Sequence, residues 1–454
     1  MSSPRITPGG VREMMLIALP MVVSYACDTF MMFTDRLLLS RLGPDFMNAA
    51  VGGSIAAFLL LSFAFGLIGY STALVAQYFG AGELKTCPRV TAQTWIFIAA
   101  FYPVILLIRP FVHDLFRVLQ VPVTQLEDQI VFFDILVYGS VFVLLRQSFC
   151  GFFSGIGRTG IVMFSSLTAL IVNVIVSFVL IYGKLGFPAL GIRGAAIGTI
   201  TGSVSAVLVA AFFYFEKSND TRFDVRSAFT FSSQVIKKWL RYGYPAGIEM
   251  FLSLLAFNGL VMAFQSMGPV VATASSIVLN WDMVAYVPLM GMEIGVTSLV
   301  GRYIGAKQLD LAHRSTMSGL KVGCVYALGL LALFTFFPVP LAQLFHPAEA
   351  SVAFAEAQPI AVAMLKMIAF YVLSVVIVIV FVGALRGAGD TLWAMSYHIS
   401  LHWTCVAVLY VSTRYLGASA VQGWAWLIAI FLVLSSGAWL RYRSGKWKNI
   451  HVLG

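Results

Sequence analysis

The sequence predicts an all-α membrane protein with twelve transmembrane helices in two parallel six-helix repeat lobes. Of its 454 residues, 60% are hydrophobic and 11% are charged, with a mean hydropathy of +0.90, whereas a soluble domain usually carries about 25% charged residues. Runs such as IVNVIVSFVLIYG are apolar on all sides and lack the alternation of a lipid-facing β-strand. The composition therefore excludes an ordinary soluble domain.

Twelve apolar segments account for the predicted helices. Each has about 20 residues or more, enough to cross a hydrocarbon core of about 30 Å. The first is too long for the apolar core of a secretory signal, so we expect it to remain as the first helix. The segments span residues 13–39, 54–79, 92–112, 130–154, 161–183, 193–215, 244–267, 271–300, 317–344, 358–384, 392–412 and 420–440.

The distribution of Lys and Arg predicts the orientation. With a cytoplasmic N-terminus, twenty of these residues fall on the cytoplasmic side, eight fall on the opposite side, and Arg146 lies inside a helix. This bias predicts a multi-pass protein of the cell inner (plasma) membrane with both termini in the cytoplasm. The net charge of +10 is then explained by topology and contact with anionic membrane lipids, and no nucleic-acid partner is expected.

An internal repeat divides the helices into two sets. A shift of 225 residues aligns Pro20 with Pro245 and YSTALVAQYFGA with GVTSLVGRYIGA, and a shift of 232 aligns SGIGRTG with RGAGDTL. Matches of Pro and Gly at a constant shift are hard to obtain by chance, because each serves a fixed backbone requirement. Six helices in each copy place both copies in the same orientation, which is the parallel-repeat arrangement of a transporter.

The repeat also predicts the domain boundaries. Helices 1–6 form an N-lobe over residues 1–215, and helices 7–12 form a C-lobe over residues 244–454. The charged segment 216–243 is expected to be a cytoplasmic connector between the lobes.

Several short motifs resemble binding sites but lack the context that such sites need. GIGRTG at 155–160 follows a membrane helix where a dinucleotide site needs a strand, and no ATP-binding P-loop sequence occurs. His398 and His402 lie one turn apart, but no acidic residue lies between them and no cysteine accompanies them at ligand spacing, so we expect helix-packing histidines and no metal. The five scattered cysteines predict neither a disulfide framework nor zinc binding. No cofactor and no enzymatic activity are expected.

Five acidic residues inside the predicted helices are the main functional signal: Asp28, Asp35, Glu249, Asp282 and Glu293. A carboxylate at the bilayer centre costs about 2.5–3.5 kcal/mol, so a chain that retains several is expected to use them. Asp28 and Asp35 are seven residues apart and share one helix face, as do Asp282 and Glu293 at a spacing of eleven.

Structural alternatives remain open for both aspartates of the first helix. Asp35 could form an interfacial ion pair with Arg36 or Arg41, and Asp28 could make an interhelical hydrogen bond. Glu293 could simply lie at the wet end of its helix.

The segments ALPMVVSYACDTFMMFTDRLLLSRLGP, GYSTALVAQYFGAG and GVTSLVGRYIGAK resemble the multidrug and toxic compound extrusion (MATE) family, as do SGIGRTG and ALRGAGDT. The resemblance covers nearly the whole chain. It implies two six-helix lobes around a central cavity and a monomeric antiporter. Such a protein exports amphipathic, often cationic small molecules in exchange for H⁺ or Na⁺.

The resemblance also suggests a cation site in the N-lobe. Asp35 matches the family carboxylate of the first helix, and Asn173 matches its polar partner. Other positions depart from the family pattern: Ser177 replaces an aspartate of some proton-coupled members, and Ser253 and Val375 replace the C-lobe carboxylates of sodium-coupled members. Glu249, Asp282 and Glu293 are therefore expected to form a secondary C-lobe site at most.

We expect Asp28 and Asp35 to act as one titrating pair that holds either a cation or a cationic substrate, so that competition drives exchange. Tyr138 and Gln147 are predicted to line the substrate cavity with Asp35. Pro20 lacks an N–H one turn inside the first helix and is the predicted hinge.

Three other functions remain as alternatives: a flippase, a membrane-embedded transferase and a passive channel. A lipid-linked oligosaccharide flippase of the same superfamily would need cationic residues in the cavity, and Arg146 is the one clear intrahelical candidate. A membrane-embedded transferase should carry polar clusters in interfacial loops. A passive channel would be separated from an exchanger by counterflow.

Overall fold

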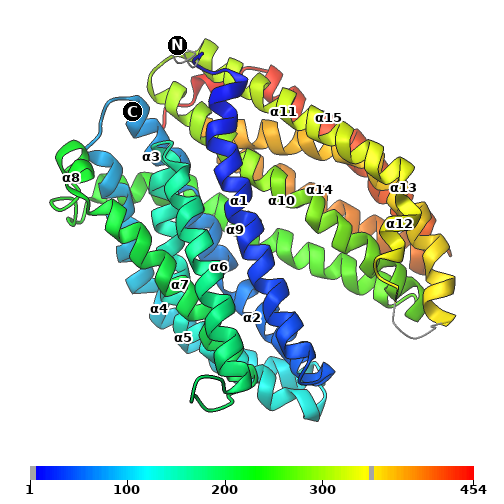
Figure 1. Cartoon of the computed structure of the whole chain (residues 1–454). Coiled ribbons are helices and arrows are strands. Elements are labelled where there is room, and N and C mark those ends of the chain that lie inside the picture. Colours follow the sequence, from blue (N-terminus) through cyan, green and yellow to red (C-terminus); the bar gives the residue numbers. More distant parts are fainter. Residues whose placement is uncertain (1–6, 347–351, 454) are drawn as a thin grey trace, which may run out of the picture. The chain divides into compact units, whose positions relative to one another are not determined.

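The computed structural model describes residues 7–346 and 352–453, and in these ranges the regular structure is entirely helical (Figure 1). The helices are α1 Val11–Ser40, α2 Pro44–Gly69, α3 Ser71–Gly80, α4 Thr86–Val118, α5 Val123–Gly155, α6 Thr159–Tyr182, α7 Ile192–Tyr214, α8 Lys217–Phe223, α9 Ser233–Gln265, α10 Pro269–Gly305, α11 Leu309–Phe336, α12 Pro338–Gln343, α13 Val352–Ala388, α14 Thr391–Arg414 and α15 Ala420–Arg443, followed by the 3₁₀ helix η1 Lys446–Asn449.

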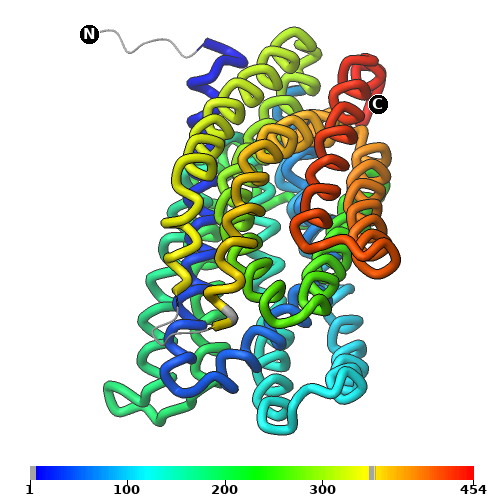
Figure 2. The backbone as a smooth tube through the Cα atoms, turned by 90° about the vertical axis from the view of Figure 1, so that its right-hand side faces the viewer, coloured from blue at the N-terminus to red at the C-terminus, as the bar shows by residue number. Residues whose placement is uncertain are grey.

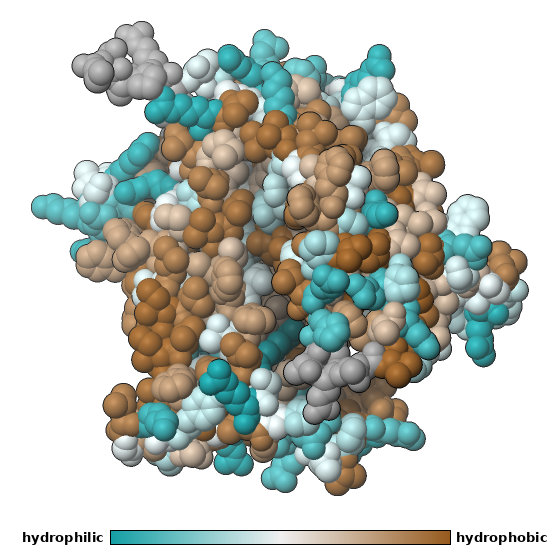
Figure 3. All heavy atoms as spheres, turned by 45° about the vertical axis from the view of Figure 1, so that its right-hand side comes forward, coloured by the Kyte–Doolittle hydropathy of each residue, from teal (hydrophilic) through white to brown (hydrophobic). Residues whose placement is uncertain are grey.

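Twelve long helical stretches confirm the predicted fold class. Within the described residues, eleven are long and apolar enough to cross a membrane, with α2 and α3 counted as one stretch, Pro44–Gly80. The twelfth is α14, whose 24 residues include two histidines and several hydroxyl side chains that lower its hydropathy. Figure 3 shows hydrophobic residues, in brown, over much of the face that it presents. The chain is a multi-pass membrane protein.

The chain divides into two compact units whose boundaries fall inside helices. Unit 2 contains Leu19–Gly247, and unit 1 contains the described residues of Ile248–Val452 together with residues 7–18. The boundaries lie within α1 and α9, close to Pro20 and Pro245. The predicted N-lobe began at residue 1, so the unit division differs from it over the start of α1.

Buried polar contacts explain why the start of α1 belongs to unit 1. The backbone N–H of Gly9 donates to Glu13 Oε2 at 2.7 Å, and the Tyr303 hydroxyl of α10 donates to the same oxygen at 2.7 Å. The Ser318 hydroxyl of α11 donates to the Gly9 carbonyl at 2.7 Å. Met14 is completely buried in the core of this unit.

Each unit is organised around one central helix. In unit 2, α5 packs against α2, α4 and α7, and α6 packs along α7. In unit 1, α13 packs against α10, α11 and α15, and α14 packs along α15. Figure 2 shows α13, α14 and α15 in yellow to red. The same contacts recur between equivalent helices, as duplication requires.

Glycines at matched repeat positions allow the central helices to approach their neighbours closely. A Cβ atom added at Gly155 of α5 would lie 2.6 Å from Val75 Cγ1 of α3. One added at Gly387 of α13 would lie 3.2 Å from the Cβ of Val300, which is the repeat counterpart of Val75. Small residues at such contacts are typical of helix packing in membranes, where close van der Waals contact stabilises the interface.

The turns after α5 and α13 anchor the segments that leave each set of six helices. Arg158 Nη1 donates to Asn219 Oδ1 of α8 at 2.9 Å, and Arg441 Nε of α15 donates to Asp390 Oδ2 at 2.8 Å. Arg158 and Asp390 occupy the same repeat position, so the duplicated turn keeps its anchoring role with opposite charge.

Gly155→Ala is expected to destabilise the protein by about 1–3 kcal/mol, because the added methyl group overpacks the contact with Val75. Gly160→Ala is the matched control, since a Cβ there meets no atom within 4 Å. Apparent melting temperatures of both variants in detergent would test this. Equal melting of Gly155→Ala and the control would contradict the packing role of Gly155.

Candidate functional site

Asp35 of α1 lies at the centre of a buried polar cluster in unit 2. Asp35 is 8% exposed, and both of its carboxylate oxygens accept hydrogen bonds. The Ser177 hydroxyl of α6 donates to Oδ1 and the Thr199 hydroxyl of α7 donates to Oδ2, each at 2.8 Å. Three helices therefore converge on one carboxylate.

Asn173 completes this cluster from one turn before Ser177 on α6. Its Nδ2 lies 3.3 and 3.2 Å from the two oxygens of Asp35, while its Oδ1 is buried without a hydrogen-bond donor. The nitrogen and oxygen ends of an amide are exchanged by a simple rotation. The rotated amide would present its oxygen to the same point as the Asp35 carboxylate, as a cation or a protonated carboxyl requires.

Glycines on α7 let this helix come close enough to α6 to build the site. A Cβ atom at Gly198 would lie 2.1 Å from Ser177 Oγ, and one at Gly202 would lie 3.1 Å from Asn173 Cβ. The absence of side chains at these positions brings the Thr199 hydroxyl, one residue after Gly198, within reach of Asp35.

Asp35 has neutral donors but no cationic partner within the described part of the chain. Arg36 donates to the sulfur of Met32, and no ion pair joins Asp35 to Arg36 or Arg41. The interfacial ion pair considered from the sequence is therefore not formed. The cluster carries one uncompensated negative charge when Asp35 is ionised, and this is a charge that a proton or a small cation is able to balance.

The structure separates Asp28 from Asp35. Asp28 Oδ1 accepts a hydrogen bond at 2.6 Å from Nη2 of Arg146 on α5, and seven residues along α1 correspond to about 10 Å of rise. The two aspartates therefore have different partners and do not form the shared pair expected from their spacing. The interhelical hydrogen bond considered as an alternative for Asp28 is present, in the form of an ion pair.

Tyr138 and Gln147 of α5 make no hydrogen bond to Asp35. The ring of Tyr138, 49% exposed, lies 4.9 Å from the guanidinium carbon of Arg109, whose Nε donates to Asp134 at 2.6 Å. The Gln147 amide lies beside Gly69 at the end of α2. Their predicted role in the substrate cavity stays a prediction.

A second buried charge cluster lies in unit 1. Arg386 of α13 pairs with Glu249 of α9 and with Glu293 of α10, and His398 Nδ1 of α14 lies 2.5 Å from Glu249 Oε1. Glu249 is 3% exposed, and its second oxygen has no hydrogen-bond partner among the described residues. A cation at this predicted secondary site would compete with Arg386 for both carboxylates.

Asp282 stands apart from the Arg386 cluster. It makes no hydrogen bond or ion pair with residues that the structure describes, and it lines a small cavity with Tyr286, Tyr371 and Val375. Val375 is the position where sodium-coupled relatives were expected to carry an aspartate. In this chain the carboxylate of the cavity is therefore Asp282 on α10, and it shares the cavity with Val375 on α13.

The histidines pack as hydrogen-bonding groups. His402 Nδ1 lies 2.9 Å from the carbonyl oxygen of His398 one turn earlier. Nδ1 of His398 itself faces Glu249. Among the described residues, no group of three or more His, Cys, Asp or Glu side chains is arranged to hold a metal ion.

Sequence reasoning missed four participants: Thr199, Arg386, His398 and the role of Arg146 as a partner of Asp28. The predicted hinge residue Pro20 lies inside α1, which is helical from Val11 to Ser40. Bending at Pro20 stays a prediction.

Comparison with known proteins gives a consistent result. The MatE family model matches residues 20–179 and 245–411. A probable multidrug resistance protein NorM of Thermotoga maritima is 26% identical over 395 residues, which cover 84% of this chain and 81% of that protein.

Two solved structures share the fold over nearly the whole chain. A MOP superfamily transporter from Pyrococcus furiosus, described as having a binding pocket of reverse polarity, superposes with a TM-score of 0.88 at 19% identity and covers 99% of this chain and 100% of its own. An outward-facing multidrug resistance MATE family transporter superposes with a TM-score of 0.87 at 20% identity and covers 98% and 100%.

Arg386→Gln is expected to lower stability by about 3–5 kcal/mol, because it leaves Glu249 and Glu293 buried without their cation. Combining Arg386→Met with Glu249→Gln and Glu293→Gln removes all three charges and should recover most of the loss. Thermal unfolding of the purified variants in detergent measures both effects. A single variant that melts like the parent would show that the two glutamates do not depend on Arg386.

Proposed function

This chain belongs to the MatE family of membrane transporters, and on that premise we propose that it is an antiporter that exports amphipathic small molecules in exchange for H⁺ or Na⁺. The observation that carries the proposal is the buried Asp35 carboxylate, which three neutral side chains contact and no cationic side chain compensates. The multidrug resistance relatives support the class of substrate.

Charge balance gives Asp35 its role. An ionised carboxylate inside a membrane bundle is costly unless a positive charge accompanies it. A proton neutralises Asp35 directly. Na⁺ would find a set of oxygens there: two from Asp35, the hydroxyls of Ser177 and Thr199, and the Asn173 carbonyl once its amide is rotated. Oxygen ligands are those preferred by hard cations.

Exchange follows if the cation binds one conformation of the transporter more tightly than the other. A ligand shifts a conformational equilibrium only by its difference in affinity for the two states. Cation binding at Asp35 from outside would favour the state that releases substrate outward, and loss of the cation inside would favour the state that takes substrate up. Alternating access of this kind uses the gradient without ATP.

We further place the protein in the cell inner membrane with both termini in the cytoplasm. The support is the excess of Lys and Arg on the predicted cytoplasmic side.

Asp35→Asn is expected to reduce gradient-driven export to about a tenth or less, since an amide neither takes up a proton nor balances a cation. The measurement is uptake of a fluorescent organic cation into proteoliposomes, with a pH gradient and a sodium gradient imposed in separate experiments. The gradient that supports transport identifies the coupling ion.

Asp114→Asn is the matched control, because Asp114 is an exposed carboxylate of α4 with a side chain 70% accessible. It should transport like the parent. Transport by Asp35→Asn at the parental rate would rule out Asp35 as the coupling site, and downhill transport without any gradient coupling in the parent would indicate a channel.

A further inference from the structure

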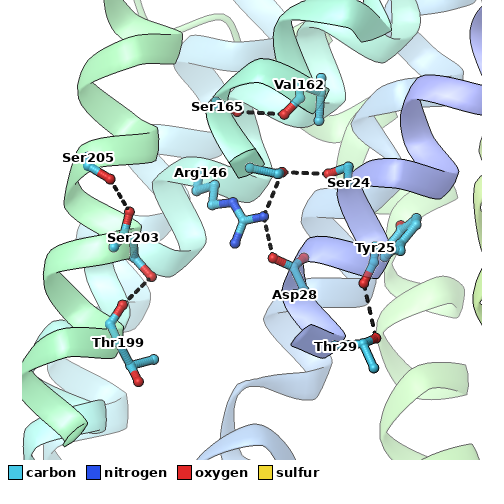
Figure 4. A network of polar contacts seen from close by, with 12 residues as sticks. Ser24, Tyr25, Asp28, Thr29, Arg146, Val162, Ser165, Thr199, Ser203 and Ser205 are labelled. Atoms are coloured by element: carbon cyan, nitrogen blue, oxygen red, sulfur yellow. Dashed lines mark hydrogen bonds and ion pairs between the residues drawn. The ribbon is translucent and has the colours of Figure 1, made fainter. Parts of the chain in front are cut away.

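A second polar network in unit 2 is built differently from the Asp35 site. Arg146 Nη2 of α5 donates to Asp28 Oδ1 of α1 at 2.6 Å and to Ser166 Oγ of α6 at 2.9 Å. The Ser166 and Ser24 hydroxyls are hydrogen-bonded at 2.6 Å. Figure 4 shows Arg146 extending from its helix towards Asp28 and the Ser24 side of α1.

The net charge of this network is zero. Asp28 contributes one negative charge and Arg146 one positive charge, whereas the Asp35 cluster has no positive side chain. An incoming cation would leave the Asp28 network with a net positive charge in a low-dielectric environment, which is unfavourable. A ligand that carries both charges adds none.

Both members of the pair retain free bonding capacity. The two hydrogen bonds of Arg146 to described residues both use Nη2, so Nη1 and Nε remain available. Asp28 uses Oδ1 and leaves Oδ2 available. The Asp28 side chain is 40% accessible and that of Arg146 is 17% accessible, so both groups keep accessible surface while they are paired.

We propose that Asp28 and Arg146 form a subsite for zwitterionic substrates, in which Asp28 binds the cationic group of the substrate and Arg146 binds its carboxylate. This assignment rests on the proposed export function and names a substrate class for it. The planar guanidinium suits a carboxylate because its N–H groups match the two oxygens. The neighbouring hydroxyls of Ser24 and Ser166 extend the polar surface available to such a head group.

The test compares a zwitterion with its own ester. Rhodamine B carries a cationic ring system and a carboxylate, and its ethyl ester keeps the cation but lacks the negative charge. Binding of each dye to the purified protein is measured by fluorescence anisotropy in detergent. We expect the parent to bind both dyes.

The informative variant is Asp28→Asn combined with Arg146→Gln, which removes both charges together and leaves no unpaired ion. It is expected to lower the ratio of rhodamine B affinity to ester affinity by about tenfold, because the charge-assisted hydrogen bonds to the carboxylate are lost. A general structural defect would weaken both dyes alike and leave the ratio unchanged.

Arg109→Gln combined with Asp134→Asn is the matched control. This pair also joins two helices of unit 2 at 2.6 Å, and its removal should leave the ratio of affinities unchanged. Arg146→Lys provides a second variant that keeps the charge but loses the planar fork, and it should lower the same ratio to a smaller extent.

A ratio that stays at the parental value in the Asp28/Arg146 variants overturns the proposal, as does a parent that fails to bind rhodamine B. Failure of the proposed function has a different signature. In that case proteoliposomes with the parent would show no gradient-driven transport of the ester, whatever the dye-binding ratio.

Discussion

Compensation of buried charge is the constraint on which the polar interior of this protein depends. Each unit contains carboxylates that water does not fully solvate, and these carboxylates have three kinds of surroundings. Asp28, Glu249 and Glu293 are paired with arginines. Asp35 is held by neutral donors. Asp282 has neither kind of partner among the described residues and faces a small cavity. The difference decides which carboxylates favour a ligand with a net positive charge.

Close helix packing makes this selective treatment possible. The donors to Asp35 come from α6 and α7, whose approach depends on the glycines at 198 and 202. The repeat keeps such glycines at matched positions while the charges change, as Arg158 and Asp390 illustrate. Duplication therefore preserved the backbone contacts that build each unit and left the charged side chains free to diverge. This divergence is consistent with the uncompensated Asp35 cluster of unit 2 and the different charge cluster of unit 1, which is centred on Arg386.

The sequence predicted the fold well, because hydrophobic length and repeated Pro and Gly are local signals. All twelve predicted spans coincide with long helical stretches. The candidate site was predicted less completely. Asp35 and Asn173 are joined as expected, but Thr199 is one of many hydroxyl residues on apolar helices, and no local pattern distinguishes it. In the sequence, Arg386 is one more basic residue beside a turn, whereas the structure places it in the last turn of α13, paired with Glu249 and Glu293.

The error over Asp28 and Asp35 has a physical cause and a mechanistic consequence. A shared helix face places two side chains in one direction but leaves them two turns apart, so each meets different neighbouring helices. The proposed exchange mechanism therefore does not rest on direct competition for one shared pair. If Asp35 binds the coupling ion and Asp28 with Arg146 binds substrate, the two events must be linked through α1, which carries both aspartates. The same helix contributes residues to both compact units. On the proposed antiport mechanism, a change in the position of α1 that alters the contacts of Asp35 would also alter those of Asp28, and this linkage would supply the coupling free energy between the two sites.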